Sequence, residues 1–487
     1  MADKAKKGGL LGSIILPLAL AQFVCSYAGS NMNVAISSIA HDLGTSVQGV
    51  QIAITFFTLT MAALMIPGSK LTDIIGRKKI FLIGLSIYGA GALIAALAPI
   101  LGVLVFGYSF LEGLGSAFLI PPVYILVTVS YTGVLRAKNF GLVSAAAGIG
   151  SAAGPLIGGF ITSAFSWRAS FILQVLIVIG IIVLSLRIVD PKLTGPKHHF
   201  DLPSTILSAI GLLLIIVGLQ TTSNYGWLTA TQNVSVGNTV VIPEGSISPF
   251  LLISGIGVLF SIAFYYSLKH REKVGKEPLL QTRILHNRTS NLGLVTQNVQ
   301  WLILQGSFFV ISVFLQTVRG YSAVQTGLIL TAATVGVLLT SSVAGRLSQR
   351  RSQRLLIRGG FIITIIGIVL LLLLARESSP VLRFIPGLFL IGAGVGIMLT
   401  SSVNVVQSAF PDKDQGEISG LSRSISNLGS SLGISIVGSV LVTSAVSENV
   451  TYAWALIIMI IFAMIGLGAA ILIPKKVEPP TIKEQTV

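Results

Sequence analysis

One acidic residue of this sequence lies well inside an apolar segment. The chain has 16 Asp and Glu residues, and all except Glu112 fall in polar connections, tails or the ends of apolar runs. A carboxylate at the depth of a hydrocarbon layer costs about 3 kcal/mol on insertion scales, so it is usually protonated, paired or functional. We therefore predict Glu112 as a proton-coupling residue. The alternative is a neutral glutamic acid bonded to a neighbouring helix.

Polar residues at helical spacing predict a cavity for a small molecule. Tyr108 and Glu112 are four residues apart and so share one face of a helix. An aromatic and amide-lined cavity with one acid suits an amphipathic or cationic solute better than a sugar or nucleotide. Polar residues also hold membrane helices together, which is the alternative role for each of them. Two further stripes complete the predicted cavity: Gln22, Ser26 and Ser30, and Gln297, Asn298, Trp301 and Gln305.

A short basic segment carries an acid among bases, in the order Gly68-Ser-Lys-Leu-Thr-Asp73-Ile-Ile-Gly76-Arg77-Lys78-Lys79. Its glycines give the backbone the freedom that a tight turn requires. An acid beside bases offers charge pairs that can be broken and remade as two helix bundles slide. The alternative role is that of a basic loop that only fixes orientation in a membrane.

A glycine series follows further along the chain, with Gly148, Gly150, Gly154, Pro155, Gly158 and Gly159. Small residues four positions apart let two helix backbones approach closely. The proline bends a helix where a neighbour can bond the freed carbonyl. Ordinary close packing is the alternative reading of this series.

The elements that must position these residues are membrane helices. Of the 487 residues, 53% are hydrophobic and 10% charged, whereas soluble domains carry about a quarter charged residues. The fold class predicted is an all-α polytopic membrane protein, because runs of about twenty apolar residues suffice to cross a bilayer. Fourteen such spans are predicted, at residues 11–39, 48–67, 79–98, 100–130, 140–165, 168–189, 203–221, 250–269, 290–318, 325–345, 356–375, 383–409, 417–446 and 452–474.

The basic residues predict the orientation of these spans. The net charge is +16, but Lys and Arg lie in the short connections between apolar runs, so membrane topology explains this charge better than a nucleic-acid surface does. With the N-terminus inside, 27 of the 32 Lys and Arg fall on the cytoplasmic side, where such residues are retained. We expect a multi-pass plasma-membrane protein with both termini in the cytoplasm.

An internal repeat divides the predicted spans. The pair Gly113 and Gly115 is answered by Gly392 and Gly394, and the pair Gly150 and Gly154 by Gly429 and Gly433, each at an offset of 279 residues. A two-fold repeat of six helices is the organisation of a rocking transporter with its substrate near the midplane. The predicted division is a six-helix bundle at 1–195, two inserted helices with an external loop at 196–285, a second six-helix bundle at 286–475 and a tail at 476–487.

The two motifs resemble those of a known family. The segment at 68–79 is similar to the signature loop of the major facilitator superfamily, and the glycine series resembles the antiporter motif of its drug exporters. With fourteen spans, the chain resembles the fourteen-helix drug:proton antiporters over its whole length. The resemblance implies two sets of functional residues: a conformational latch of Gly68, Asp73, Gly76 and Arg77, and an antiporter motif of Gly150, Gly154, Pro155, Gly158 and Gly159.

The chain departs from this family at its usual membrane charges. Ala28 stands where such exporters often carry an aspartate upstream of the segment beginning at Asn33. Ser109 replaces the arginine of the family's Arg-x-x-Gln-Gly pattern, and Glu112 stands in place of its glutamine. These changes leave the coupling mechanism open.

The predicted function is proton-coupled export of lipophilic or cationic small molecules. An uncoupled facilitator or a translocator of lipid-like substrates is the first alternative, and a membrane scaffold or receptor without transport is the second. We expect small-molecule, proton and lipid partners, no nucleic acid and a monomer. No phosphate-binding loop or metal-ligand spacing is found in the sequence, so we predict neither an enzyme nor a cofactor. Outside the membrane we expect a hairpin at Thr239–Ile242 and possible glycan acceptors at Asn233 and Asn449.

Overall fold

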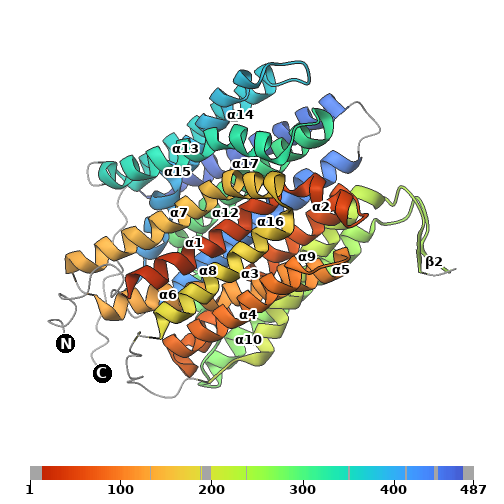
Figure 1. Ribbon diagram of the computed structural model, residues 1–487. Helices are drawn as coiled ribbons and strands as arrows, with labels where there is room; N and C mark the ends of the chain where they lie inside the picture. Colours follow the sequence, from red (N-terminus) through yellow and green to blue (C-terminus); the bar gives the residue numbers. More distant parts are fainter. Residues whose placement is uncertain are drawn as a thin grey trace. The chain divides into compact units, whose positions relative to one another are not determined.

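The computed structural model describes residues 14–131, 133–186, 188, 199–236, 239–348, 351–411, 414–443 and 448–474, and this part of the chain is helical apart from one short hairpin (Figure 1). The elements are α1 (Ile15–Asn31), η3 (Met32–Val34), α2 (Ile36–Asp42), α3 (Val47–Ile75), α4 (Arg77–Ala96), α5 (Leu101–Leu104), η4 (Val105–Glu112), α6 (Gly113–Ser130), α7 (Gly133–Ala164), α8 (Trp167–Ser185), α9 (Leu202–Tyr225), β1 (Val234–Val236), β2 (Thr239–Ile242), α10 (Pro249–Lys273), α11 (Thr282–Leu285), α12 (Arg288–Val313), η5 (Phe314–Val318), α13 (Ala323–Leu347), α14 (Gln353–Leu374), η6 (Val381–Arg383), α15 (Ile385–Gln407), α16 (Gln415–Thr443) and α17 (Glu448–Leu472).

The predicted spans coincide with these helices. Within the described residues, 13 helical segments are long and apolar enough to cross a membrane. The remaining predicted span, residues 11–39, corresponds to the 17-residue helix α1 followed by η3 and α2. The expected fold, a polytopic α-helical membrane protein, is confirmed. Outward faces are apolar, as lipid requires; Leu176 is 61% exposed and Ile461 55% exposed.

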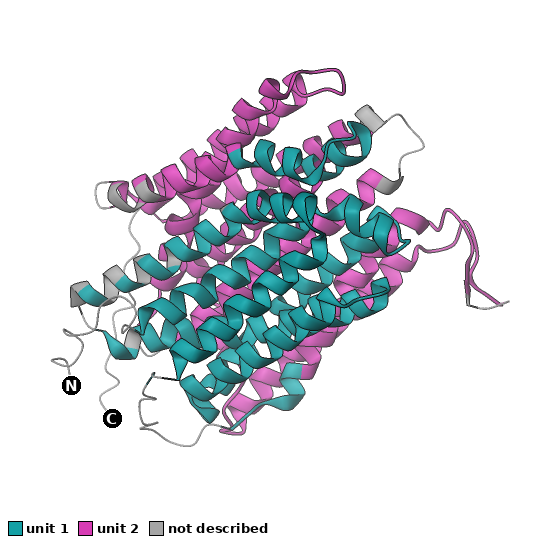
Figure 2. Cartoon of the chain, viewed as in Figure 1, with its two compact units in different colours: residues 1–205, 311–331 teal, residues 206–310, 332–487 magenta. Residues whose placement is uncertain are grey.

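The chain folds into two compact units, coloured separately in Figure 2. Unit 1 comprises residues 1–205 and 311–331, and unit 2 comprises residues 206–310 and 332–487. In unit 1, α4 packs against both α6 and α8, and α1 packs along α7. In unit 2, α14 packs against both α15 and α17. At the 279-residue offset α4, α6 and α8 correspond to α14, α15 and α17, so the sequence repeat is matched by the same helix pairs.

Glycines bring the helix backbones together at corresponding places of the two units. A Cβ atom added to Gly115 of α6 would lie 2.6 Å from the backbone nitrogen of Tyr88 in α4. A Cβ atom added to Gly394 of α15 would lie 2.8 Å from the backbone nitrogen of Thr364 in α14. Contacts this close exclude any larger side chain. The glycines of the repeat therefore mark helix crossings.

Basic residues at the start of the third helix in each predicted repeat donate hydrogen bonds to the end of the sixth helix. Lys78 of α4 donates from Nζ to the carbonyl of Leu186, directly after α8, at 2.9 Å. In unit 2, Arg354 and Arg358 of α14 both donate to the carbonyl of Ile471, in the last turn of α17, at 2.6 and 2.9 Å. Cations at a helix C-terminus satisfy its free carbonyls and complement the helix dipole. These bases stabilise helix ends in addition to any effect on orientation.

A small hairpin connects α9 to α10, and β2 extends beyond the ends of these helices in Figure 1. Its two strands are antiparallel, and Val234 pairs with Ile242. The β-prone stretch predicted at Thr239–Ile242 is therefore confirmed as β2.

Candidate functional site

Glu112 is the last residue of a π-helical segment, η4, and is completely buried. The sequence predicts an uninterrupted helix over residues 100–130, but residues 105–112 are wound more widely than an α-helix. Such segments are rare and occur frequently at functional sites. Neither carboxyl oxygen of Glu112 has a hydrogen-bond partner of standard geometry among the described residues. The acid therefore lies in a site that offers it no basic partner.

Three tyrosines of unit 1 lie near this carboxyl group. Tyr88 of α4 is close enough to interact with it, as are Tyr27 of α1 and Tyr108 of η4. The Tyr88 hydroxyl also lies 3.2 Å from the carbonyl oxygen of Val24 and in hydrogen-bond contact with Oε1 of Gln174. The Tyr88 hydroxyl thus links α4 to α1 and α8 close to Glu112.

Tyr108 lies in the same π-helical segment as Glu112 and is fully buried, and the shared face expected from their spacing stays a prediction. Its ring stacks on Phe57 with 4.6 Å between centroids, and its edge meets Phe171 at 5.7 Å. Its hydroxyl donates to the carbonyl of Ala28 at 3.0 Å. Ser109 donates to the carbonyl of Ala53 at 2.7 Å. The two positions at which the family resemblance leads us to expect charges, 28 and 109, are therefore part of neutral hydrogen bonds.

The predicted stripe on α1 lies beside α7. Gln22 donates to Ser26 at 3.3 Å, and Ser30 donates to carbonyls of its own helix. A Cβ atom added to Gly150 of α7 would lie 3.1 Å from Cβ of Ser26, and one added to Gly154 would lie 3.0 Å from Cβ of Ser30. Ser26 and Ser30 thus take part in a close helix contact, which is the alternative role considered for them.

The predicted stripe on α12 lies toward α16 in unit 2. Gln297 accepts a hydrogen bond from Ser422 at 2.9 Å, and Asn298 donates to the carbonyl of Ile425 at 3.0 Å. Trp301 is half-buried and Gln305 is buried. The stripes of α1 and α12 belong to different units, so their common cavity stays a prediction.

The predicted latch residues lie where α3 turns into α4. Gly76 has φ of +113°, a backbone conformation that side chains disfavour, and it is the single residue between the two helices. A Cβ atom on Gly68 would collide with the carbonyl of Ala117 in α6. Asp73 is half-buried in the last turns of α3, and Nε of Arg77 is buried without a hydrogen-bond partner among the described residues. The glycines have clear structural roles, and the latch remains a prediction.

The glycine series places α7 between α1 and the start of α13, all within unit 1. A Cβ atom on Gly158 would lie 2.9 Å from Cβ of Asn31 in α1. One on Gly159 would lie 2.6 Å from the carbonyl oxygen of Ala323. The carbonyl oxygen of Pro155 lies so close to Gly327 that a side chain at position 327 would collide with this oxygen. Consecutive residues of the series therefore contact helices from both predicted repeats.

Gln316 of η5 is a residue that the sequence reasoning missed. Its Nε2 donates to the carbonyl of Asn33 at 3.2 Å, and its Oε1 accepts from the backbone nitrogen of Ser37 at 3.2 Å. Gln316 and Ser37 are 279 residues apart, which is the offset of the internal repeat. A residue meets its own repeat counterpart only near the axis that relates the repeats. The offset could have identified this pair.

An ion pair joins the end of α2 to the start of α8. Arg168 pairs with Asp42 and donates to the carbonyl of Ala98 at 2.9 Å. The Trp167 indole donates to the same carboxylate at 2.9 Å. The Arg168 guanidinium, with help from Trp167, holds the pKa of Asp42 below its usual value. Arg168, one of the few bases on the predicted external side, is thus used in packing.

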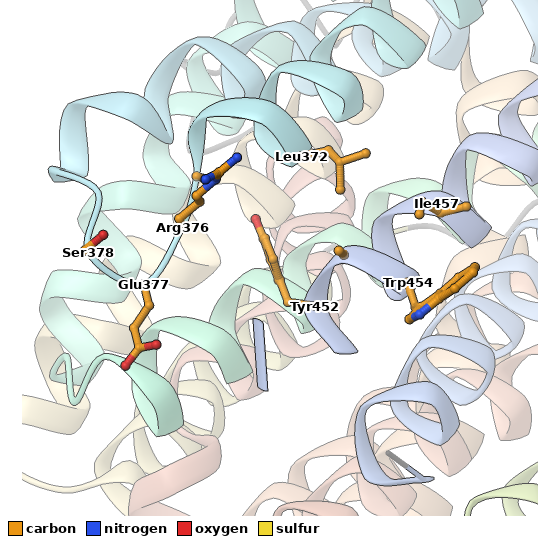
Figure 3. A pocket seen from close by; sticks show the side chains of 9 residues that line it. Leu372, Arg376, Glu377, Ser378, Tyr452, Trp454 and Ile457 are labelled. Atoms are coloured by element: carbon orange, nitrogen blue, oxygen red, sulfur yellow. The ribbon is translucent and has the colours of Figure 1, made fainter. Parts of the chain in front are cut away.

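A cavity of about 730 Å³ lies in unit 2 between the end of α14 and the start of α17. Leu372, Arg376, Tyr452 and Trp454 are among its lining residues. Figure 3 shows the Tyr452 hydroxyl turned toward the loop with Arg376 and the Trp454 ring turned the other way. None of the predicted site residues lines it.

Comparison with known families gives one match that covers most of the chain. The model described as Major Facilitator Superfamily matches residues 18–434 and 293–486. Curated relatives include the puromycin resistance protein pur8 of Streptomyces alboniger, with 27% identity over 88% of this chain and 81% of that protein. The multidrug resistance protein Stp of Mycobacterium tuberculosis is 26% identical over 84% of this chain and 72% of its own. The probable actinorhodin transporter of Streptomyces coelicolor is 25% identical over 89% and 72%.

Solved structures with a similar fold are also transporters. A POT family transporter in complex with 5-aminolevulinic acid superposes with a TM-score of 0.64 and 15% identity, covering 95% of this chain and 96% of that chain. A mutant peptide transporter POT in complex with alafosfalin gives a TM-score of 0.67 with 15% identity, covering 97% of both chains. At this identity the likeness concerns the fold alone.

Proposed function

Since the chain belongs to the major facilitator superfamily, we propose that it exports lipophilic or cationic small molecules in exchange for protons by alternating access. Relatives named for puromycin resistance, multidrug resistance and actinorhodin transport support export of such compounds. A secondary transporter of this kind takes its energy from an ion gradient, with the substrate bound near the midplane.

The observation that carries this proposal is the position of the antiporter motif. Gly154 and Gly158 contact α1, whereas Gly159 contacts the start of α13. Alternating access requires that the two repeats separate at one membrane face while they meet at the other. The motif supplies a surface of glycine backbone on which such a contact can form and break without side chains interlocking. A static scaffold has no need of it.

Beside this glycine contact between the repeats, Gln316 and its two backbone partners form a gate. The gate comprises Gln316, Asn33 and Ser37, and it lies beside the motif in unit 1. In the predicted topology these residues are at the external ends of their helices. Their hydrogen bonds form in a state closed to the outside and break when substrate is released there.

Proton exchange is assigned to Glu112. An acid at membrane depth without a basic partner is a functional group by default. Release of its proton leaves a buried charge that the neutral surroundings stabilise poorly, so the protonation state alters the relative energies of the conformations. Coupling of a gradient to transport requires such a difference.

Purified protein in vesicles with an imposed pH gradient tests the proposal. A fluorescent lipophilic cation such as ethidium should cross the membrane in the direction opposite to the flow of protons down their gradient. A protonophore should abolish this movement. In the Glu112→Gln variant, gradient-driven accumulation should fall to the level of empty vesicles while the protein stays folded. Full coupling in that variant would contradict the assignment of Glu112.

An uncoupled facilitator is the second candidate. Ala28 and Ser109 stand at positions that are charged in the related exporters, and both take part in neutral hydrogen bonds. Such a protein would equilibrate ethidium at a rate that does not depend on the pH gradient. The vesicle experiment distinguishes the two candidates directly.

We further propose a plasma-membrane location with both termini in the cytoplasm, a monomeric transporter and surrounding lipid as its main contact. The charge asymmetry of the connections supports the orientation. The division into bundles at 1–195 and 286–475 with two inserted helices at 196–285 also remains a proposal. Its support is the matching of helix pairs in the two units.

A further inference from the structure

We propose that Tyr88 is the positioning residue that detects the protonation state of Glu112 and transmits it to α1 and α8. This inference rests on the proposed function, in which Glu112 carries the coupled proton. It adds a residue on α4 that neither the spacing of the acids nor the motifs predict.

Two glycines hold Tyr88 and Glu112 at the same helix crossing. Gly91 follows Tyr88 by three residues, and a Cβ atom there would lie 2.7 Å from the backbone nitrogen of Glu112. Gly115 follows Glu112 by three residues, and a Cβ atom there would lie 2.6 Å from the backbone nitrogen of Tyr88. The contact is therefore reciprocal, and it fixes each backbone against the glycine of the other helix.

The Tyr88 hydroxyl has one proton and more than one acceptor within reach. A phenol donates one hydrogen bond and accepts others. Its acceptors are the Val24 carbonyl at 3.2 Å and Oε1 of Gln174, and the Glu112 carboxyl is also in range. When Glu112 is protonated, the acid can donate to the Tyr88 oxygen, and the phenol proton remains available for α1 or α8.

Loss of the Glu112 proton reverses this arrangement. A carboxylate is an acceptor only, so the phenol proton turns toward Glu112 and leaves Val24 and Gln174. Nε2 of Gln174 has no hydrogen-bond partner among the described residues. Rotation of this amide would let Nε2 donate to the Tyr88 oxygen in place of the lost bond. The protonation state of Glu112 thereby selects how α4 is bonded to α1 and α8.

The other side chains near Glu112 keep their protons at neutral pH, so Glu112 is the group of this site that changes its protonation state. They are Cys25 and Tyr27 from α1 and Tyr108 from η4. Cysteine and tyrosine ordinarily lose their protons above about pH 8. Two further neighbours carry no charge. They are Gln174 of α8 and Thr60 of α3, which contacts Gly113. The described part of the site thus contains one carboxyl group and no base.

Infrared difference spectroscopy of the purified full-length protein in lipid, recorded across a pH change, tests this inference without transport. The band of the protonated carboxyl group is assigned to Glu112 by its loss in the Glu112→Gln variant. In Tyr88→Phe this band should move to higher frequency, because the protonated acid loses the tyrosine oxygen to which it donates. In Gln174→Ala it should move to lower frequency, because a competing acceptor is removed from Tyr88.

Tyr452→Phe is the matched control. It removes the hydroxyl group of another buried phenol, which belongs to unit 2 and is not among the groups that face Glu112, so it should leave the Glu112 band where it is. An unchanged band in Tyr88→Phe, or equal movement in Tyr452→Phe, would overturn the inference while leaving pH-driven transport intact. A moved band without pH-driven transport would instead refute the proposed function and keep the positioning role. If Tyr88→Phe does not fold, Gln174→Ala still tests the inference, because the Glu112 band is then expected to move in the opposite direction, to lower frequency.

Discussion

At the scale of single residues, the described part of the molecule contains carboxylates that hold its structure through ion pairs and one buried acid, Glu112, that has no basic partner there. Asp42 has an arginine and an indole as partners. Asp414 is buried and pairs with Arg283. Glu112 has tyrosines and a thiol around it, and its oxygens are not bonded in standard geometry. A buried carboxylate without compensation is strongly unfavourable, so this conformation suits the neutral acid.

The pair of Asp42 and Arg168 has a predictable pH dependence. The pKa of Asp42 is lowered in the folded protein from its reference value of 3.8. Its contribution to stability is therefore present above about pH 4 and is lost as the pH falls through the lowered pKa. We expect Asp42→Asn to lower the unfolding free energy by about 1 kcal/mol at pH 7, as for other solvent-accessible pairs. Thermal unfolding in detergent measures this effect.

The same variant contains its own control. Asparagine keeps an oxygen that can accept from the Trp167 indole, so the difference reports mainly the charge. The difference between wild type and Asp42→Asn should shrink as the pH is lowered below about 4, where Asp42 also becomes neutral. A difference that stays constant as the pH falls from neutral through that range would show that packing, and not charge, accounts for it.

At the scale of helices, glycine decides which backbones touch. Gly158 of α7 lies against Asn31, where an added Cβ atom would be 2.9 Å from the Asn31 Cβ and 3.2 Å from its Cα. Gly180 of α8 has nothing within 4 Å of its added Cβ atom. The same substitution, glycine to alanine, at these two sites therefore distinguishes an effect on helix packing from an effect on helix propensity.

We expect Gly158→Ala to destabilise the protein by about 1–3 kcal/mol, as overpacking does. It should also slow ethidium transport, because α7 and α1 are forced apart beside the gate. Gly180→Ala should be neutral or stabilising by up to about 1 kcal/mol, because alanine is the better helix former. Thermal unfolding and vesicle transport of both variants check this prediction. Equal effects of the two substitutions would refute the packing argument.

Sequence reasoning reached the helices more completely than the contacts between them. The fourteen apolar runs predicted from the sequence coincide with helices, because length and hydropathy are local properties of the sequence. The π-helical winding of residues 105–112 was not predicted, because it depends on how closely α4 approaches at Gly91 and Gly107. In the sequence, Tyr88 and Gln174 are isolated polar residues in apolar runs. Their link to Glu112 exists only once three helices cross.

At the scale of the whole molecule, the repeat offset locates a gate. Gln316 bonds to both Asn33 and Ser37, its own repeat counterpart. Loss of each hydrogen bond of this kind costs about 1 kcal/mol, so loss of both corresponds to about a thirtyfold change in a conformational equilibrium. The Gln316→Ala variant should therefore favour the state that is open to the outside.

Labelling of one cysteine measures this shift. Cys25 is the single native cysteine and is buried, so Cys25→Ala gives a suitable background. Asn33→Cys in that background is fully buried in the closed gate and retains the backbone carbonyl that Gln316 bonds. A membrane-impermeant maleimide added outside should label it about thirty times faster with Gln316→Ala than with Gln316. Equal rates would contradict the gate.

The number of spans decides the orientation of every later connection. Helix α1 has 17 residues, which at 1.5 Å per residue is about 25 Å, slightly less than the hydrocarbon core of about 30 Å. The η3 and α2 segments extend it toward the next helix. If the segment from α1 to α2 crosses the membrane, the chain has fourteen spans and both termini lie on one side. If it does not, the two ends of the chain lie on opposite sides.

Two cysteines and a tag on the N-terminus distinguish these topologies. In the Cys25→Ala background, Ser235→Cys in the exposed hairpin should react with the impermeant maleimide in intact cells, and Lys273→Cys at the end of α10 should react only after permeabilisation. An N-terminal tag should be digested by protease only after permeabilisation. This combination is expected for fourteen spans, because the basic residues of the Lys273 connection and of the N-terminus are then all retained in the cytoplasm. A tag digested in intact cells, with the two cysteines unchanged, would instead show that the α1 segment does not span the membrane and would remove α1 from the proposed transport pathway.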